Sequence, residues 1–158
     1  MALRRSASAA LLGAALSAVP WLPAAAVEPE PSGCDASRSR QGDNLERYKR
    51  DLACRIHARN GTHLYDGAPP PVLRSVVVLS VRVDARGRLV RIGVLRFNGI
   101  RSLERRAIQS VRAAAPLPIP ALALLRHGAA DITETWLFRD DGRFQIRTLA
   151  QVQAPSGY

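Results

Sequence analysis

A chain of 158 residues is long enough for about one domain with a single core. An apolar fraction of 47% and the lack of low-complexity repeats exclude a wholly disordered chain. The formal net charge of +10 rests almost entirely on arginine, because Lys49 is the only lysine. This charge fits nucleic acid, an anionic membrane surface or acidic protein partners, and equally an arginine-rich genome.

The first 26 residues have the layout of a secretory signal peptide. Two arginines near the start are followed by an apolar stretch, two prolines and three alanines that end at Ala26. We therefore expect residues 1–26 to be removed on export and the protein to reside in the periplasm. The alternative is an uncleaved inner-membrane anchor facing the periplasm, since the apolar stretch approaches the roughly 20 residues that span a bilayer.

Residues 27–42 are rich in Pro, Ser, Gly and charge, which predicts a flexible lead-in. Cys34 lies in this segment and Cys54 lies in the helix expected next. Because exported proteins fold in an oxidising compartment, we expect these two cysteines to form a disulfide. The three histidines do not cluster, so no metal site is expected.

Residues 43–150 are expected to form one domain, followed by a disordered tail at residues 151–158. Its first element is a helix in DNLERYKRDLACRIHARNG, with Asp43 as the N-cap and Gly61 at the end. The apolar stripe of this helix consists of Leu45, Tyr48, Leu52 and Ile56.

The stretch SVVVLSVRVDARGRLVRIGVLRF predicts a β-hairpin. Apolar residues alternate from Val77 to Val83, which is the period of a half-buried strand. DARG suits a type I turn with a following bulge, in which Gly87 adopts a positive φ. Residues 89–97 then return as the partner strand.

The stretch NGIRSLERRAIQSVRAAAP predicts a second helix, because apolar residues line one side and arginines the other. The apolar side consists of Ile100, Leu103, Ala107, Val111 and Ala114. Pro116 must end this helix, since proline lacks a backbone N–H and its ring clashes with the preceding turn.

The stretch ADITETWLFRDDGRFQIRTL predicts a strand, a turn at residues 140–142 and a shorter strand. Glu134 falls on the same strand face as three apolar residues, where we expect an arginine to pair with it. The fold class is therefore α+β, with a small antiparallel sheet of three to four strands and two helices packed on one face.

Three of these motifs together resemble the C-terminal domain of TonB-type energy transducers and, less closely, that of TolA. SVRVDARGRLVRIGVLRF is similar to the first hairpin of the family, SLERRAIQSVRAAAPLPIP to its proline-stopped helix, and ITETWLF to its returning strand. The resemblance covers residues 65–149. It implies that the proline-rich segment crosses back over the sheet, with Leu117 and Ile119 packed against the core.

TonB-type domains bind extended segments of outer-membrane proteins, partly by adding a strand at a sheet edge. The resemblance therefore implies a periplasmic protein-binding module of the Gram-negative envelope, whose partner is a segment of an outer-membrane or periplasmic protein. The implied contact residues are Gln145, Ile146, Arg147 and Thr148, which form the last strand, and Tyr65, which precedes the first strand. In the alternative interpretations, this last strand only closes the core, or a second copy pairs with it to form a homodimer.

Two features differ from a full transducer. Residues 1–26 contain no histidine, and the lead-in spans only roughly 50 Å at full extension. The alternative function is a short membrane-anchored transducer that couples a proton-driven inner-membrane motor to outer-membrane receptors. Membrane contact is expected only if residues 1–26 are retained.

Other function classes have little support in the sequence. It contains no nucleophile elbow, zinc-protease motif or phosphate loop, so we expect neither an enzyme nor a cofactor. The arginines are dispersed and aromatic residues are few, so we expect no nucleic-acid partner.

Overall fold

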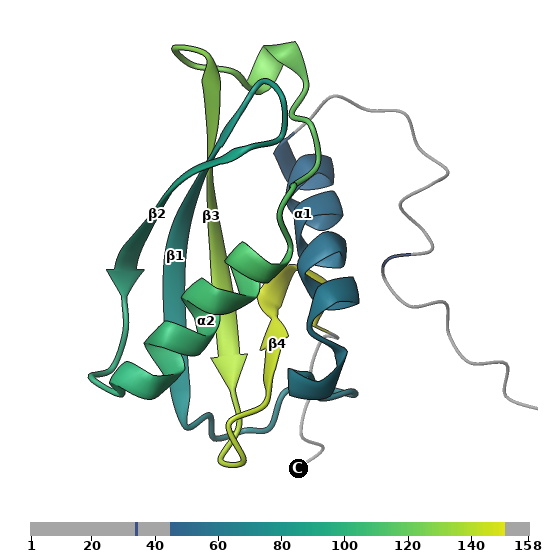
Figure 1. The fold of residues 1–158 in the computed structure, drawn as a ribbon. Helices are drawn as coiled ribbons and strands as arrows, with labels where there is room; N and C mark the ends of the chain where they lie inside the picture. The colour runs from purple at the N-terminus through teal and green to yellow at the C-terminus, as the bar shows by residue number, and fades with distance from the viewer. Residues whose placement is uncertain (1–33, 35–44, 151–158) are drawn as a thin grey trace, which may run out of the picture. The chain divides into compact units, whose positions relative to one another are not determined.

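The computed structural model describes residue 34 and residues 45–150. Both helices lie on one face of a four-stranded antiparallel sheet (Figure 1), so the fold class is the α+β arrangement that the sequence predicts. The helices and strands are α1 (Leu45–Arg59), β1 (Ser75–Asp84), β2 (Leu89–Arg96), α2 (Arg101–Ala113), β3 (Ala129–Phe138) and β4 (Phe144–Ile146). Short 3-10 helices occur at η2 (Gly61–His63), η3 (Leu122–Leu124) and η4 (Arg147–Leu149).

None of the helices in the described part of the chain combines the length and apolar character needed to cross a bilayer. The expected signal peptide, the N-cap at Asp43 and the tail at residues 151–158 lie outside the described residues, as does the lead-in apart from Cys34.

The sheet has the strand order β2-β1-β3-β4, which places β1 and β3 at its centre. These two strands pair without interruption from Ser75 and Phe138 at one end to Asp84 and Ala129 at the other. Residues of β1 alternate between buried and half-buried along the strand, because only one face of the sheet is covered by helices.

The core fills the space between this covered face and the two helices. Its largest fully buried side chains are Trp136, Phe138, Phe144, Leu52, Ile56, Leu79 and Ile132. The predicted stripe of α1 is buried at Tyr48, Leu52 and Ile56, but Leu45 is 44% exposed. Leu45 is the first residue of the helix and lies at the end of the domain, so the stripe begins one turn later than predicted.

The first hairpin turns as the sequence predicts. The Gly87 N–H donates to the Asp84 carbonyl at 3.0 Å, and the Asp84 N–H donates to the Arg88 carbonyl at 3.0 Å. Gly87 has a φ of +77°. A Cβ at this position would also lie 2.4 Å from the Leu117 carbonyl oxygen, so two independent constraints require glycine.

The proline-rich crossover differs from the prediction at one residue. The helix α2 ends at Ala113, ahead of Pro116, and Leu117 is buried as expected. Ile119, however, is 70% exposed, so its predicted contact with the core is wrong. The next buried residue after Leu117 is Pro120, three positions later. Three residues is the period of a polyproline-type segment, so Ile119 between them points outward.

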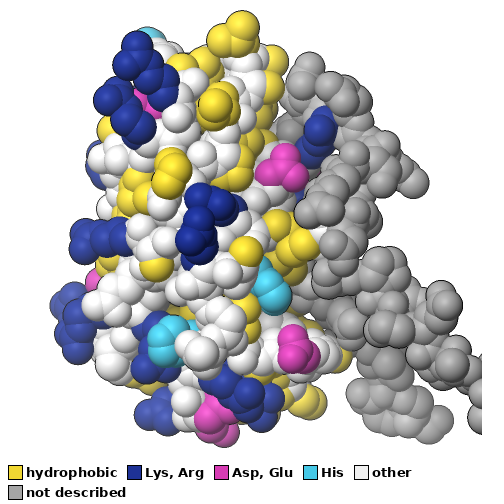
Figure 2. All heavy atoms as spheres, turned by 45° about the vertical axis from the view of Figure 1, so that its right-hand side comes forward, with side chains coloured by type: hydrophobic (Ala, Val, Ile, Leu, Met, Phe, Trp, Pro, Cys, Tyr) yellow, Lys and Arg dark blue, Asp and Glu magenta, His cyan; other side chains and the backbone are white. Residues whose placement is uncertain are grey.

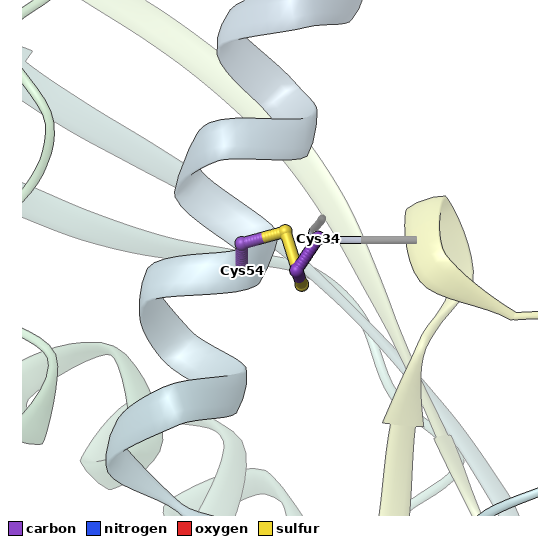
Figure 3. The surroundings of a disulfide bond; sticks show 2 residues. All are labelled: Cys34 and Cys54. Atoms are coloured by element: carbon purple, nitrogen blue, oxygen red, sulfur yellow. A yellow bond between two sulfur atoms is a disulfide. The ribbon is translucent and has the colours of Figure 1, made fainter. Parts of the chain in front are cut away.

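The predicted disulfide is present. It joins Cys34 to Cys54, midway along α1, across a sequence separation of 20 residues (Figure 3). The bond therefore fastens the segment that precedes the domain to the middle of its first helix.

Candidate functional site

The strand β4, which the family resemblance implies as the binding edge, is shorter than predicted. Gln145 and Ile146 lie in it, but Arg147 and Thr148 lie in η4, so the expected strand to Thr148 is wrong. The chain leaves the sheet because the Ala150 N–H donates to the carbonyls of Ile146 and Arg147, each at 3.1 Å.

The outer side of β4 is already occupied by this same chain. Carbonyls alternate in an antiparallel pair, so those of Phe144 and Ile146 point away from β3. The first accepts a hydrogen bond from the Tyr65 N–H at 3.3 Å and the second from the Ala150 N–H at 3.1 Å. The Gln145 side chain adds two bonds from Nε2, to the carbonyl of Tyr65 at 2.9 Å and of Gly67 at 2.7 Å. An incoming strand would have to displace these contacts.

Two of the implied contact residues carry buried polar atoms without a hydrogen-bond partner among the described residues. These atoms are the Tyr65 hydroxyl and the Gln145 Oε1. Burial raises the pKa of Tyr65, while the Arg139 guanidinium, which lies 5.1 Å from the ring centroid, lowers it. Tyr65 and Ile146 are each only 2% exposed, so both belong to the core as well as to this edge.

The strand β2 forms the opposite edge, with no further strand beside it among residues 45–150. The Asp84 N–H donates to the Arg88 carbonyl, in the turn that leads into β2. The backbone N–H and C=O groups of every second residue point to the same side of a strand, so those of Ser80 also point toward β2. Ser80 pairs with Gly93. The N–H and C=O groups of Ile92 and Val94, on either side of Gly93, therefore point away from the sheet.

The regular part of this edge is short. Register shifts between Val78 and Leu79 and between Arg82 and Val83 leave Leu95 and Val90 as extra residues of β2. Such bulges interrupt pairing and bend an edge strand, so they confine the regular edge to residues 91–94. Apolar side chains are nevertheless exposed within this stretch and at the bulges on either side of it: Val90 is 56% exposed, Val94 38% and Leu95 59%.

The sequence-based prediction placed the binding edge at β4 and not at β2. The available signal was the adjacent apolar pairs Leu89-Val90 and Val94-Leu95, which break strict alternation and indicate bulges.

Arginines lie along the β2 edge. Arg91 and Arg96 are exposed, and each lies within or beside the regular stretch. Arg88, which immediately precedes the strand, forms an ion pair with Asp84 at 2.6 Å. The edge therefore presents backbone hydrogen-bonding groups, apolar side chains and positive charge together.

Glu134 is 3% exposed, and among the described residues it has no arginine partner, contrary to the prediction. Its carboxylate accepts hydrogen bonds from the Thr148 hydroxyl and, at 2.8 Å, from the Thr135 N–H. Burial raises the pKa of Glu134 above its ordinary value of 4.5, and the two hydrogen bonds and the charge of Lys49 oppose that rise. The carboxylate thus fastens η4 to the sheet.

A shallow cleft of about 370 Å³ lies between the end of α1 and α2. Its lining residues are Arg59, Asn60, Thr62, His63, Arg106, Gln109, Ser110 and Ala113. Ser110, the hydroxyl nearest the core, accepts a hydrogen bond from Trp136 Nε1 at 2.9 Å and donates one to the Ala107 carbonyl at 2.7 Å. It is therefore a structural residue. Nowhere in the described residues do three histidine, cysteine or acidic side chains come together as a metal site.

Comparisons of this chain with protein-family models, with curated proteins and with solved structures find no match.

Proposed function

We propose that this chain is a protein-binding module of the Gram-negative envelope that recognises an extended peptide segment by strand addition at β2. The order of hairpin, proline-stopped helix and returning strand, which resembles the TonB C-terminal domain, supports this class of function. The observation that carries the proposal is the direction of the Ile92 and Val94 backbone groups, away from β1. A strand laid beside β2 can pair with them largely independently of its side chains.

The charge of the edge favours an acidic segment as the partner. Arg91 and Arg96 can pair with carboxylates of the incoming strand on one face of the sheet, and Val94 offers an apolar contact on the other face. A second copy of this chain would bring its own Arg91 and Arg96 to the same edge, where like charges repel. A foreign acidic peptide is therefore favoured over a homodimer.

The opposite edge is a poorer place for strand addition. There the outward carbonyls of Phe144 and Ile146 already accept hydrogen bonds from the same chain. A partner that bound there would have to break these bonds and the two made by the Gln145 amide. At β2 no such exchange is required, so more of the new bond energy contributes to binding.

The test compares two variants at one position. Val94→Pro removes an outward N–H that no strand of the sheet uses, whereas Val94→Ala keeps this N–H and loses only side-chain contacts. We expect peptides selected from a random display library on the wild-type protein to bind Val94→Pro about tenfold more weakly, because one hydrogen bond is lost and the ring blocks the edge. Val94→Ala should retain most of the affinity.

Equal affinity of both variants for the selected peptides, with thermal unfolding unchanged, would place binding elsewhere. Failure of the library to yield any acidic peptide would contradict the choice of partner. If substitution of Gln145, and not of Val94, weakens the binding of the selected peptides, the binding site is at β4.

We further propose that the module acts in the periplasm after removal of residues 1–26. The alternative, a membrane-anchored transducer, is disfavoured by the disulfide. Because Cys34 is bonded to α1, residues 27–34 set the reach of a retained anchor, which is at most about 28 Å. The whole lead-in would reach roughly 50 Å at full extension, so the disulfide shortens the reach of an anchored domain.

The intact mass of the protein from fractionated source cells separates these two alternatives. We expect a periplasmic species that lacks about 26 residues, the length of a typical signal peptide. A full-length mass in the inner-membrane fraction would make the anchored form the correct one.

A further inference from the structure

The end of the domain that carries the β1–β2 turn exposes a group of apolar side chains. We call it the hairpin end and define it as residues 84–88 and 117–128. The two segments meet because the Leu117 N–H donates to the Gly87 carbonyl at 2.9 Å, and because Asp84 pairs with Ala129 at the start of β3.

The apolar residues at the hairpin end project into solvent. Leu122 in η3 is 85% exposed and Ile119 in the crossover is 70% exposed, and Ala123 beside them is exposed as well. In Figure 2 apolar side chains gather at the top of the molecule, which is the end that holds this turn in Figure 1. Exposed large apolar residues at a loop tip are typical of a surface that contacts a protein or a membrane.

Positive charge surrounds this apolar tip. The two segments contain three arginines, Arg86, Arg88 and Arg126, and one acid, Asp84, for a net charge of 3 − 1 = +2 with His127 neutral. The acid is bound to Arg88, which leaves the charges of Arg86 and Arg126 unopposed within these segments. Apolar side chains framed by arginines suit a bilayer surface, since the former enter the headgroup boundary and the latter attract anionic headgroups.

The first helix begins at this same end. Leu45 begins α1 there, as Figure 1 shows, and Tyr48 in the first turn donates a hydrogen bond to the Pro118 carbonyl of the crossover at 2.8 Å. This hydrogen bond holds the crossover, which carries Ile119, against α1.

From these observations we infer that the hairpin end docks on an anionic membrane surface, with Ile119 and Leu122 inserted and Arg86 and Arg126 at the headgroups. This inference does not depend on strand addition, because β2 residues 91–94 lie beyond the turn and are outside the defined segments. A membrane-docked domain would therefore present its peptide-binding edge at the bilayer surface.

The experiment uses the protein with the N-terminus that the source cell gives it and a spin label at Ala123→Cys, which keeps Leu122 in place. The matched control carries the label at Ser102→Cys, an exposed site in the first turn of α2, at the opposite end of the sheet. Vesicles are made of phosphatidylcholine alone or of phosphatidylcholine and phosphatidylglycerol in equal parts. The readout is the accessibility of each label to oxygen, which dissolves in lipid, and to a water-soluble nickel complex.

We expect the label at position 123 to become accessible to oxygen and shielded from nickel only with phosphatidylglycerol, while the label at position 102 stays accessible to nickel. Leu122→Asp, or Arg86→Ala with Arg126→Ala, should abolish this shift; Leu122 is so exposed that its replacement leaves the core intact. Equal nickel accessibility at both positions would overturn the inference. So would immobilisation of the label at position 123 without vesicles together with a dimeric mass, because a second copy would then cover the surface.

Discussion

At the scale of single residues, Ser110 connects the sheet to α2 through one buried hydrogen bond. Its hydroxyl is the partner of the Trp136 indole N–H at 2.9 Å, and both residues are at most 2% exposed. Ser110→Ala would leave that N–H buried and unpaired, which costs about 1–3 kcal/mol of unfolding free energy. Urea unfolding measures this loss. Ser102→Ala on the exposed first turn is the control, and equal stabilities of the two variants would show that the bond contributes little.

Glu134 makes the stability depend on pH in a defined direction. Burial raises its pKa in the folded protein above 4.5, so the folded state holds the proton more tightly than the unfolded chain. The contribution of Glu134 to stability is therefore full below pH 4.5 and is lost as the pH rises through the raised pKa. Asp84 and Asp141 have lowered pKa values, and their contributions are lost only as the pH falls below 3.8.

Glu134→Gln should remove the loss of stability above pH 4.5, because the amide does not ionise and can still bond Thr148 and Thr135. Unfolding free energies of both proteins across this range test the claim. If the two profiles have the same slope, Glu134 is not the group responsible.

Residue patterns alone could not identify the partner of Glu134. Its position on the buried face of β3 follows from strict alternation, which the structure confirms. The partner, Thr148, reaches it only because the chain leaves β4 for η4 after Ile146. That departure depends on contacts between distant parts of the chain, so an arginine was the wrong expectation.

At the scale of elements, the turn of the first hairpin must fit against the crossover. Gly87→Ala combines a φ of +77° with a Cβ placed 2.4 Å from the Leu117 carbonyl oxygen, so backbone must shift to relieve it. Gly99→Ala has a φ of +89° with no atom within 4 Å and carries only the conformational cost. We expect Gly87→Ala to be the more destabilising, by about 1–3 kcal/mol. Thermal unfolding of the two variants measures this difference. Equal losses of stability would mean that the crossover shifts to make room for the added Cβ.

The sequence predicts those elements whose signals are local. The two hairpins, with glycine at a required positive φ, and α2, with its proline stop, have the predicted locations. The bulges of β2 and the outward turn of Ile119 were missed, since each arises where one element adjusts to another. The edge proposed for strand addition depends on the strand order, which places β2 at the outside of the sheet and which no local pattern specifies.

At the scale of the whole molecule, the disulfide restrains the unfolded chain. It closes a loop across a sequence separation of 20 residues, and in the chain-entropy model its loss costs about 3 kcal/mol. Cys34→Ser with Cys54→Ser should lower the unfolding free energy by this amount, and reductant should not affect the double variant further. A double variant as stable as the oxidised wild type would show that the bond contributes little to folding stability.

The two edges of the sheet differ in their capacity to bind an incoming strand. One edge is closed by hydrogen bonds from Tyr65 and Ala150, and the other has outward backbone groups at Ile92 and Val94 beside two exposed arginines. Binding at β2 would extend the sheet without rearranging the core, because the fully buried side chains lie on β1, β3, β4 and the helices. Strand addition at β2 would therefore use the backbone amides of Ile92 and Val94.

Amide hydrogen exchange with and without a selected acidic peptide tests that claim most directly. Our account predicts that the amides of Ile92 and Val94 become strongly protected when the peptide binds, while that of Gly93, already paired with β1, changes little. Protection confined to the segment around Tyr65 and Gln145, or none along β2, would contradict it.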